Sequence, residues 1–293
     1  MPTSFQTIGL LAKPSDDRLL DTLSRLATCL TALGRTVLLD QATLPDHPSL
    51  RSYARATRDE LGKHSDLVIA IGGDGTLIHA AHCLSAYAKP VLGINLGRLG
   101  FLVDISPDEM QSRLERIFSG EYILEKRFLL LGEVIRDTDV VHRGEVFNDL
   151  VYKVRDTVRM IEFETHIDGR YLLTQRSDGM VISTPSGSTA YALSAGGPIL
   201  TPGLEAVVLA PICPHTLSNR PIVIPSTSTI EIRATRHSRA NSLVSFDGQC
   251  QIDLEPKDTL RVSRSPRYAQ LIHPADYDYF HILRAKLHWG GHP

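Results

Sequence analysis

The sequence predicts two domains. An α/β domain with a Rossmann-like parallel sheet is expected over residues 1–126, and a mostly antiparallel, β-sandwich-like domain over residues 127–273. In the first part, short apolar segments alternate with segments of helical periodicity, which is typical of a parallel sheet with crossover helices. From about Phe128, apolar and polar residues alternate, which is typical of antiparallel strands with one buried face. A length of 293 residues suffices for two domains.

The elements of the first part follow from apolar runs and from residues that end helices. The segment Asp17–Leu33 carries leucines and alanines at helical spacing, and Gly34 favours a helix end there. Further helices are expected from Thr76 onward and over Pro107–Phe118. The predicted strands are Thr7–Leu11, Thr36–Asp40, Leu67–Ile71 and Pro90–Asn95.

Two Asp-Gly pairs predict tight turns in the second part. Asp168-Gly169 separates the strand-like segments Arg159–Ile167 and Arg170–Arg176, and Asp247-Gly248 is expected to form a second turn. The last segment, Tyr277–Trp289, is predicted to be a helix with an apolar side. We expect this side to dock on the first domain or on another subunit.

Composition excludes several classes of protein. A formal net charge of -2 argues against a dedicated nucleic-acid binder. The four cysteines form no C-x-x-C pair, which predicts reduced, buried thiols in a cytosolic protein. There is no H-E-x-x-H motif, and His79 and His82 are expected to be partly exposed rather than metal ligands. Without a signal sequence or a long apolar run, the protein is predicted to be cytoplasmic and not to bind membranes.

The segment Gly72-Gly73-Asp74-Gly75-Thr76 follows a predicted buried strand and opens a predicted helix. Glycines allow a sharp turn and a close approach to a ligand, and a helix start offers free N–H groups to phosphate. The carboxylate of Asp74 would repel phosphate oxygens, so it suits a different task. It can hold a cation or take a proton from a hydroxyl that attacks phosphate. A simple strand-to-helix turn that contains an aspartate is the alternative.

Two further segments suggest ligand binding. In Ser177–Gly197, a predicted strand leads into a loop of small and hydroxyl residues and then into a short helix that opens near Ser188 or Thr189. The loop resembles a phosphate cradle but lacks the Gly-Lys-Ser/Thr ending of a Walker A loop. A Ser/Thr-capped helix is the alternative there. Asn148-Asp149 interrupts an apolar strand with an amide and a carboxylate, which suit the hydroxyls and base edge of a nucleoside. Both side chains can meet one ligand only near a strand end or a bulge, and a plain turn is equally compatible.

Taken in order along the chain, these segments resemble the bacterial NAD kinase family. The resemblance also includes Gly93–Phe101, Arg176–Gly179, Pro214–Pro221 and the tail from Tyr277 to Trp289. It covers nearly the whole chain. The chain has neither the G-x-G-x-x-G dinucleotide fingerprint nor the H-R-D and D-F-G motifs of protein kinases.

The resemblance implies transfer of the γ-phosphoryl group of ATP to the 2′-hydroxyl of the adenosine ribose of NAD, which gives NADP. Asp74 would be the catalytic general base. The residues implied to contact the dinucleotide are Asp74, Gly75, Asn148, Asp149, Arg159, Arg176, Asp178, Thr189, Ala190, Tyr191, Ala192, Leu193, Ser194 and Gln249. The family usually has Asn-Glu where this chain has Asn148-Asp149, so the carboxylate at Asp149 is one methylene shorter.

The resemblance also implies ligands and assembly. Mg²⁺ would arrive with ATP, so no dedicated metal ligands are expected, and polyphosphate is an alternative donor. NADP(H) would be the product and a possible feedback ligand. A homotetramer is implied, with the last helix (segment 274–293) returning to the first domain and the site between the domains. A lipid or sphingoid kinase that shares the glycine-aspartate loop, and an inactive NADP-binding sensor, are the alternatives.

Overall fold

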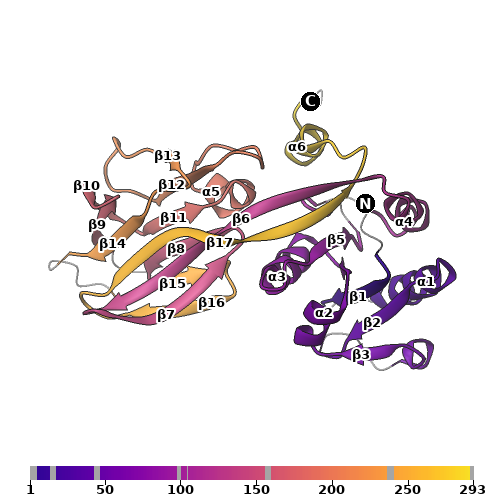
Figure 1. Cartoon of the computed structure of the whole chain (residues 1–293). Coiled ribbons are helices and arrows are strands. Elements are labelled where there is room, and N and C mark those ends of the chain that lie inside the picture. Colours follow the sequence, from indigo (N-terminus) through magenta and orange to yellow (C-terminus); the bar gives the residue numbers. More distant parts are fainter. Residues whose placement is uncertain are drawn as a thin grey trace. The chain divides into compact units, whose positions relative to one another are not determined.

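The computed structural model describes residues 5–13, 18–42, 47–97, 100–103, 105–155, 160–235 and 241–290 (Figure 1). The chain forms two compact units, unit 1 with residues 1–126 and 269–293, and unit 2 with residues 127–268. Both boundaries fall inside long strands, β6 (Tyr122–Arg136) and β17 (Thr259–Pro274). The chain thus returns to unit 1 at Ala269, within β17.

Unit 1 contains a parallel sheet in the order β17–β5–β4–β1–β2–β3. Its strands are apolar and mostly buried, as expected where helices cover a parallel sheet. The strands are β1 (Thr7–Ala12), β2 (Thr36–Asp40), β3 (Ala54–Ala56), β4 (Leu67–Ile71) and β5 (Pro90–Ile94). The helices are α1 (Leu19–Ala32), α2 (Arg58–His64), α3 (Asp74–Ser85), α4 (Met110–Phe118) and α6 (Tyr279–Leu287), with a 3₁₀ turn, η1, at Pro48–Leu50.

The predicted α/β architecture of the first part is confirmed, with small differences in the elements. Leu23, Leu26 and Leu30 of α1 are fully buried in the core, as their helical spacing predicts. The helix expected from Thr76 begins two residues earlier, at Asp74. We did not predict β3 or α2. The start of α2 is nevertheless recognisable in the sequence, because Thr57 and Glu60 form a capping box there.

Unit 2 consists of two antiparallel sheets. One has the order β10–β9–β14–β17–β6–β7, and the other β13–β12–β11–β8–β15–β16. Their remaining strands are β7 (Asp139–Val146), β8 (Asp149–Val154), β9 (Ile161–Ile167), β10 (Arg170–Ser177), β11 (Gly179–Ser183), β12 (Ala206–Ile212), β13 (Ile222–Pro225), β14 (Ile230–Ala234), β15 (Ser242–Phe246) and β16 (Cys250–Leu254).

Apolar side chains from both sheets form one core, so the sandwich-like prediction is confirmed. Tyr152 of β8 packs edge to face on Phe163 of β9, with ring centroids 5.0 Å apart. On the other face of the second sheet, Val151 packs with Ala192 of the short helix α5 (Tyr191–Ser194), which follows the 3₁₀ turn η2 (Ser186–Thr189). This sheet is therefore covered on both faces.

Both predicted Asp-Gly turns are present. Asp168-Gly169 joins β9 to β10 with φ values of 51° and 74°, and Asp247-Gly248 joins β15 to β16 with φ values of 49° and 68°. Positive φ at both central residues is the requirement of a type I′ hairpin turn, and Asp-Gly meets it at low cost.

The tail helix α6 belongs to unit 1, as the resemblance implied. It buries Ile282 and Leu283 but leaves Phe280 57% and Trp289 53% exposed. None of the helices in the described part of the chain has the length and apolar character needed to cross a membrane.

The prediction of buried thiols was wrong. Cys29 and Cys83 are half-buried, and Cys213 and Cys250 are exposed; all four are free. Cys213 lies directly after β12 with φ of 45°, and Cys250 begins the edge strand β16.

Candidate active site

In unit 1, the carboxyl ends of three parallel strands lie side by side. Ala12 at the end of β1 pairs with Ile71 at the end of β4, and Ile71 pairs with Ile94 at the end of β5. The chain leads from β1 through α1 to β2 on one side, and from β4 through α3 to β5 on the other. Such a switch point is where open α/β sheets bind ligands. The Gly72–Gly75 loop leaves the sheet there.

The carboxylate of Asp74 is held by the main chain of a neighbouring loop. Oδ2 accepts a hydrogen bond from the N–H of Phe101 (2.7 Å), and Oδ1 accepts from Leu102 (3.0 Å) and Val103 (3.2 Å). A Cβ on Gly100 would overlap Asp74 Oδ1, so this approach requires glycine at position 100. The carboxylate is thereby fixed at the first residue of α3.

Asp74 does not cap its own helix. The N-cap residue of α3 is Gly73, and no side chain caps this end. A carboxylate has about four lone-pair positions, of which three are used here. Within the described part of the chain, one position on Oδ2 remains for a further donor. Gly73 and Gly75 are exposed with open space on the Cβ side, so their main chain is accessible to a ligand.

Two basic residues that sequence reasoning missed lie at the same edge of the sheet. Lys13 directly follows β1 and is exposed. Arg18 precedes α1, and its guanidinium lies 3.0 Å from the position that a Cβ on Gly97 would occupy. Gly97 belongs to the loop after β5. The signal in the sequence was their place between the first strand and the helix that follows it, at the end where parallel sheets bind ligands.

In unit 2, Asn148 and Asp149 lie where the sequence allowed them to share a ligand. Asn148 is outside the strands, and Asp149 is the first residue of β8. Both line a pocket of about 290 Å³. Oδ1 of Asn148 is buried with no hydrogen-bond partner among the described residues, which leaves an acceptor available to a ligand.

The carboxylate of Asp247 holds the main chain before β8, just as the carboxylate of Asp74 binds the main chain of the loop after β5. The Asp247 carboxylate accepts hydrogen bonds from the main-chain N–H groups of Phe147 (2.7 Å), Asn148 (2.8 Å) and Asp149 (3.0 Å). Sequence reasoning identified Asp247 only as a turn residue. Its second role depends on the pairing of β15 with β8, which brings the turn to the segment before Asp149.

The loop of small and hydroxyl residues after β11 contacts the main-chain carbonyl of Asn148, whereas Asp247 binds its N–H group. The carbonyl of Asn148 accepts hydrogen bonds from Thr184 N (2.9 Å) and Ser183 Oγ (3.3 Å). A Cβ on Gly187 would overlap the same carbonyl, so the loop can approach only with glycine there. The main chain of Asn148 is therefore held from two sides, and its side chain faces the pocket.

The pocket combines predicted and unpredicted residues. From the prediction it contains Asn148, Asp149, Ala190 and Tyr191. The lining residues that we did not predict are Val151, Lys153, Ser245, Asp247, Gly248 and Gln251. Lys153 adds a cation, and Tyr191, 42% exposed, adds an aromatic face.

Two groups in this region have raised pKa values. Burial and the nearby carboxylate of Asp247 raise the pKa of Asp149 to about 7. Burial raises the pKa of Tyr191, with smaller contributions from Cys213, Asp178 and Asp149. Asp178 is therefore within electrostatic reach of the Tyr191 hydroxyl, although it does not line the pocket.

The other predicted residues lie outside the pocket lining. Arg176 is exposed on β10, and its carbonyl accepts a hydrogen bond from His215 N (2.9 Å). Ala192 is fully buried in the core, so only its main chain could reach a ligand. Thr189 and Leu193 are half-buried, and Ser194 and Gln249 are exposed. Arg159 lies outside the residues that the structure describes.

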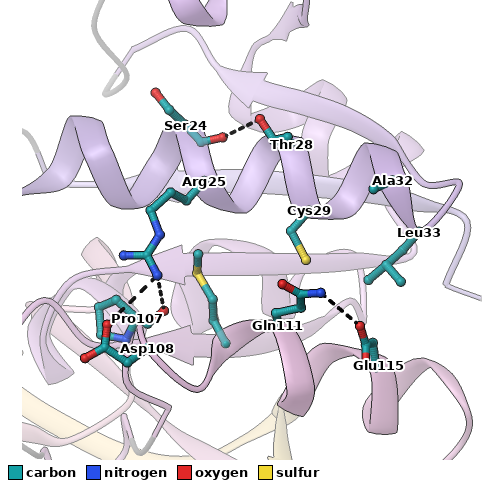
Figure 2. A pocket seen from close by; sticks show the side chains of 11 residues that line it. Ser24, Arg25, Thr28, Cys29, Ala32, Leu33, Pro107, Asp108, Gln111 and Glu115 are labelled. Carbon is teal, nitrogen blue, oxygen red and sulfur yellow. Dashed lines mark hydrogen bonds and ion pairs between the residues drawn. The ribbon is translucent and has the colours of Figure 1, made fainter.

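A second, larger pocket contains none of the predicted residues. It measures about 720 Å³ and lies between α1 and α4 (Figure 2). Its polar side chains already have partners: Arg25 donates to the carbonyl of Pro107 (3.2 Å), and Gln111 donates to Glu115 (3.2 Å). We therefore do not assign the chemistry to this pocket.

No three His, Cys, Asp or Glu side chains come together as a metal-binding group among the residues that the structure describes. The carboxylate of Asp74 already accepts three N–H groups. With three of its lone-pair positions occupied, this carboxylate is a poor ligand for a resident Mg²⁺, an ion that proteins usually hold through one or two carboxylates together with waters and substrate phosphates.

Comparison with known proteins agrees with this arrangement. Residues 8–122 match the ATP-NAD kinase N-terminal domain, and residues 147–274 match the ATP-NAD kinase C-terminal domain. A protein named NAD kinase from Nitrosococcus oceani is 47% identical over 99% of this chain and 99% of its own length. One from Pseudomonas entomophila is 43% identical over 98% of this chain and 96% of its own.

Solved structures match as well. An NAD kinase from Archaeoglobus fulgidus in complex with ATP has a TM-score of 0.75 at 26% identity, covering 97% of this chain and 99% of its own. Yeast NADH kinase complexed with NADH has a TM-score of 0.88 at 23% identity, covering 99% of this chain and 90% of its own, and shows the shared fold. Both parts of the chain thus match the two parts of one class of two-domain kinase. The chain belongs to the ATP-NAD kinase family.

The raised pKa of Asp149 predicts a pH-dependent stability. Between about pH 4 and about pH 7 the folded protein binds a proton at Asp149 that the unfolded chain has released. The free energy of unfolding should therefore fall as pH rises through this window, by up to about 1.4 kcal/mol per unit of pKa shift. Denaturant unfolding of the wild type and Asp149→Asn measures this, because the variant lacks the ionisable group.

The difference in stability between the Asn variant and the wild type should grow from pH 4 to pH 8 in favour of the variant. Asp139→Asn, at an exposed carboxylate on β7, is the matched control. Its stability difference from the wild type should change little between pH 4 and pH 8. Parallel pH curves for the wild type and Asp149→Asn would contradict the burial argument.

Proposed function

We propose that this protein is an NAD kinase that transfers the γ-phosphoryl group of ATP to the 2′-hydroxyl of the adenosine ribose of NAD. The observation that carries the proposal is the fixed carboxylate of Asp74 at the switch point of the parallel sheet, beside exposed glycine main chain. Family membership over the whole chain supports it. Phosphoryl transfer depends mainly on positioning and on neutralising charge, and the fixed carboxylate and the glycine loop supply the positioning.

In the proposed mechanism, Asp74 is the general base. The three amides from Phe101, Leu102 and Val103 hold the carboxylate in one orientation, and the remaining position on Oδ2 accepts the proton of the attacking hydroxyl. The main chain of Gly73 and Gly75 approaches the phosphates of ATP at the start of α3.

Lys13 and Arg18 are proposed to neutralise phosphate oxygens at the same edge of the sheet. The guanidinium of Arg18 lies at the loop after β5, and the chain leaves β1 at Lys13. Arg can donate two parallel hydrogen bonds to a phosphate, whereas Lys supplies a compact charge.

The NAD contacts are proposed for unit 2. The side-chain amide of Asn148 and the carboxylate of Asp149 suit the hydroxyls and base edge of a nucleoside, and Tyr191 suits stacking. Lys153 is an added candidate for an anionic group. The other predicted contacts in this part of the chain remain part of the proposal: Arg159, Arg176, Asp178, Thr189, Ala190, Ala192, Leu193, Ser194 and Gln249. From unit 1, Asp74 and Gly75 are proposed to contact NAD as well.

Further proposals concern the form of the phosphate donor, the product and the cellular location of the protein. Mg²⁺ is proposed to enter as part of the substrate Mg-ATP, and polyphosphate is a possible second donor. NADP(H) is proposed as the product and feedback ligand, and the protein is proposed to act in the cytoplasm. A lipid or sphingoid kinase is less well supported, because the family match extends over both domains. An inactive NADP-binding sensor is less well supported, because Asp74 is retained and its carboxylate is held in place.

The activity can be tested directly. Purified protein incubated with NAD and Mg-ATP should produce NADP, and parallel reactions with NADH and with polyphosphate define the acceptor and the donor. Binding of NADP measured by calorimetry, without NADP formation from any donor, would establish the sensor instead.

Asp74→Asn should lower kcat on the order of 10²–10⁴-fold, because an amide cannot accept the proton. Asn offers one acceptor oxygen in place of two, so part of the hydrogen bonding to Phe101–Val103 is lost as well. The free energy of unfolding should fall by about 1–3 kcal/mol. Enzyme kinetics and denaturant unfolding on the same variant measure both effects.

Two other variants separate chemistry from stability. Asp66 accepts hydrogen bonds from Gln6 N (2.9 Å) and Thr7 N (2.8 Å), so Asp66→Asn should lose stability but keep its kcat. Gly100→Ala keeps the Asp74 carboxylate but displaces it, and should lower kcat. If Asp74→Asn retains more than about a tenth of the wild-type kcat, Asp74 is not the base.

We also propose a homotetramer. Phe280 and Trp289 of the tail remain more than half exposed in the single chain, and large exposed apolar side chains often mark protein interfaces. Light scattering at micromolar concentration should give the mass of four chains. A fully active monomer under these conditions would contradict the proposal.

A further inference from the structure

The three amides that bind the Asp74 carboxylate differ in what they control. Leu102 and Val103 donate to Oδ1, and their side chains are buried, 7% and 1% exposed. Phe101 donates to Oδ2, through the shortest of the three hydrogen bonds (2.7 Å). Oδ2 is also the oxygen whose remaining lone-pair position is proposed above to accept the proton. The position of Phe101 therefore acts most directly on the reactive oxygen.

The side chain of Phe101 is held by the tail helix. Val103 packs on the parallel sheet, since its Cγ2 lies 2.9 Å from the position that a Cβ on Gly93 of β5 would occupy. Phe101, by contrast, is only half-buried. Lys286 Nζ of α6 lies over its ring, 5.6 Å from the ring centroid. A cation in this position is attracted to the face of the ring.

The docking of α6 determines which of its side chains reaches that ring. Ile282 and Leu283 are each 3% exposed. Lys286 follows them at helical spacing, so these residues share one face of the helix, and Lys286 is half-buried. Arg284, the other basic residue of the last turn, is exposed, and its guanidinium lies 3.6 Å from the exposed carboxylate of Asp278.

We propose that Lys286 is a positioning residue for phosphoryl transfer: through the Phe101 ring, it holds the loop that orients the Asp74 carboxylate. The inference rests on the proposed function, because it depends on Asp74 as the base. Lys286 needs no contact with NAD or ATP for this role. The tail helix is thereby part of the catalytic arrangement without touching a substrate.

Lys286→Met removes the charge and keeps a long, unbranched side chain. The kcat should fall about 2–5-fold, which is the equivalent of about 0.5–1 kcal/mol for a cation over an aromatic ring. The KM values for NAD and Mg-ATP should stay near those of the wild type, because the lost contact orients the base and does not bind substrate. Equal kcat values for the wild type and Lys286→Met would overturn the proposal.

Two further variants are matched to this one. Lys286→Arg retains a cation that can stack on the ring, so it should keep most of the kcat. Arg284→Met removes an exposed charge from the same helix and should keep the wild-type kcat, because an exposed ion pair contributes little. A loss of kcat in Arg284→Met as large as that in Lys286→Met would mean that net charge, not the contact with Phe101, is responsible.

A double-mutant cycle separates positioning from direct contact with phosphate. Phe101→Leu removes the ring but keeps the N–H group that binds Asp74. In this background, Lys286→Met should cause no further loss of kcat, because its partner is already absent. The proposal fails if Lys286→Met lowers kcat equally in both backgrounds, or if it raises the KM for Mg-ATP.

Hydrogen exchange tests the contact without any reaction. Peptides that cover Gly100–Val103, followed by mass spectrometry, should exchange about 2–5-fold faster in Lys286→Met, because the loop opens more readily. Arg284→Met should exchange like the wild type. Unchanged exchange in Lys286→Met would contradict the proposal. If the wild type forms no NADP from any donor, the proposed function fails, whereas the exchange rates still show whether Lys286 holds the loop.

Discussion

Two carboxylates, those of Asp74 and Asp247, each accept hydrogen bonds from three consecutive main-chain amides, and the candidate sites in both units depend on these contacts. Irregular segments lack the regular hydrogen bonds of helices and sheets, so their buried N–H groups need other partners. An ionised carboxylate is a strong acceptor with room for several donors. In each unit, one aspartate therefore orders a loop that secondary structure alone would leave unsatisfied.

The same contacts explain why particular glycines are needed. Gly100 and Gly187 are not among the residues with positive φ, so backbone conformation does not require glycine at either position. At Gly100 a Cβ would overlap the Asp74 carboxylate, and at Gly187 it would overlap the carbonyl of Asn148. Both glycines permit close approach between chain segments, and that approach sets where the functional side chains lie.

Asp247 links the order of the unit 2 pocket to its electrostatics. Its carboxylate fixes the main chain from Phe147 to Asp149, and its negative charge adds to the burial that raises the pKa of Asp149. Because the pKa of Asp149 is about 7, a ligand that binds in this pocket can change whether the carboxyl group is protonated. The folded state is less stable when Asp149 ionises, because a buried carboxylate beside another negative charge is unfavourable.

The sequence by itself determined the two fold classes, both Asp-Gly hairpin turns and the loop that opens α3, whereas for Asn148-Asp149 it left a strand end, a bulge and a turn open. These features are encoded within a few neighbouring residues, through side-chain periodicity, allowed φ values and helix-start chemistry. Only the tertiary structure decided that Asp247 holds Asn148, that Arg18 reaches the loop at Gly97, and that Lys153 lines the pocket. It also decided that no cysteine is fully buried. The reason is that strand pairing and register, which no local pattern specifies, bring residues about a hundred positions apart within hydrogen-bond distance.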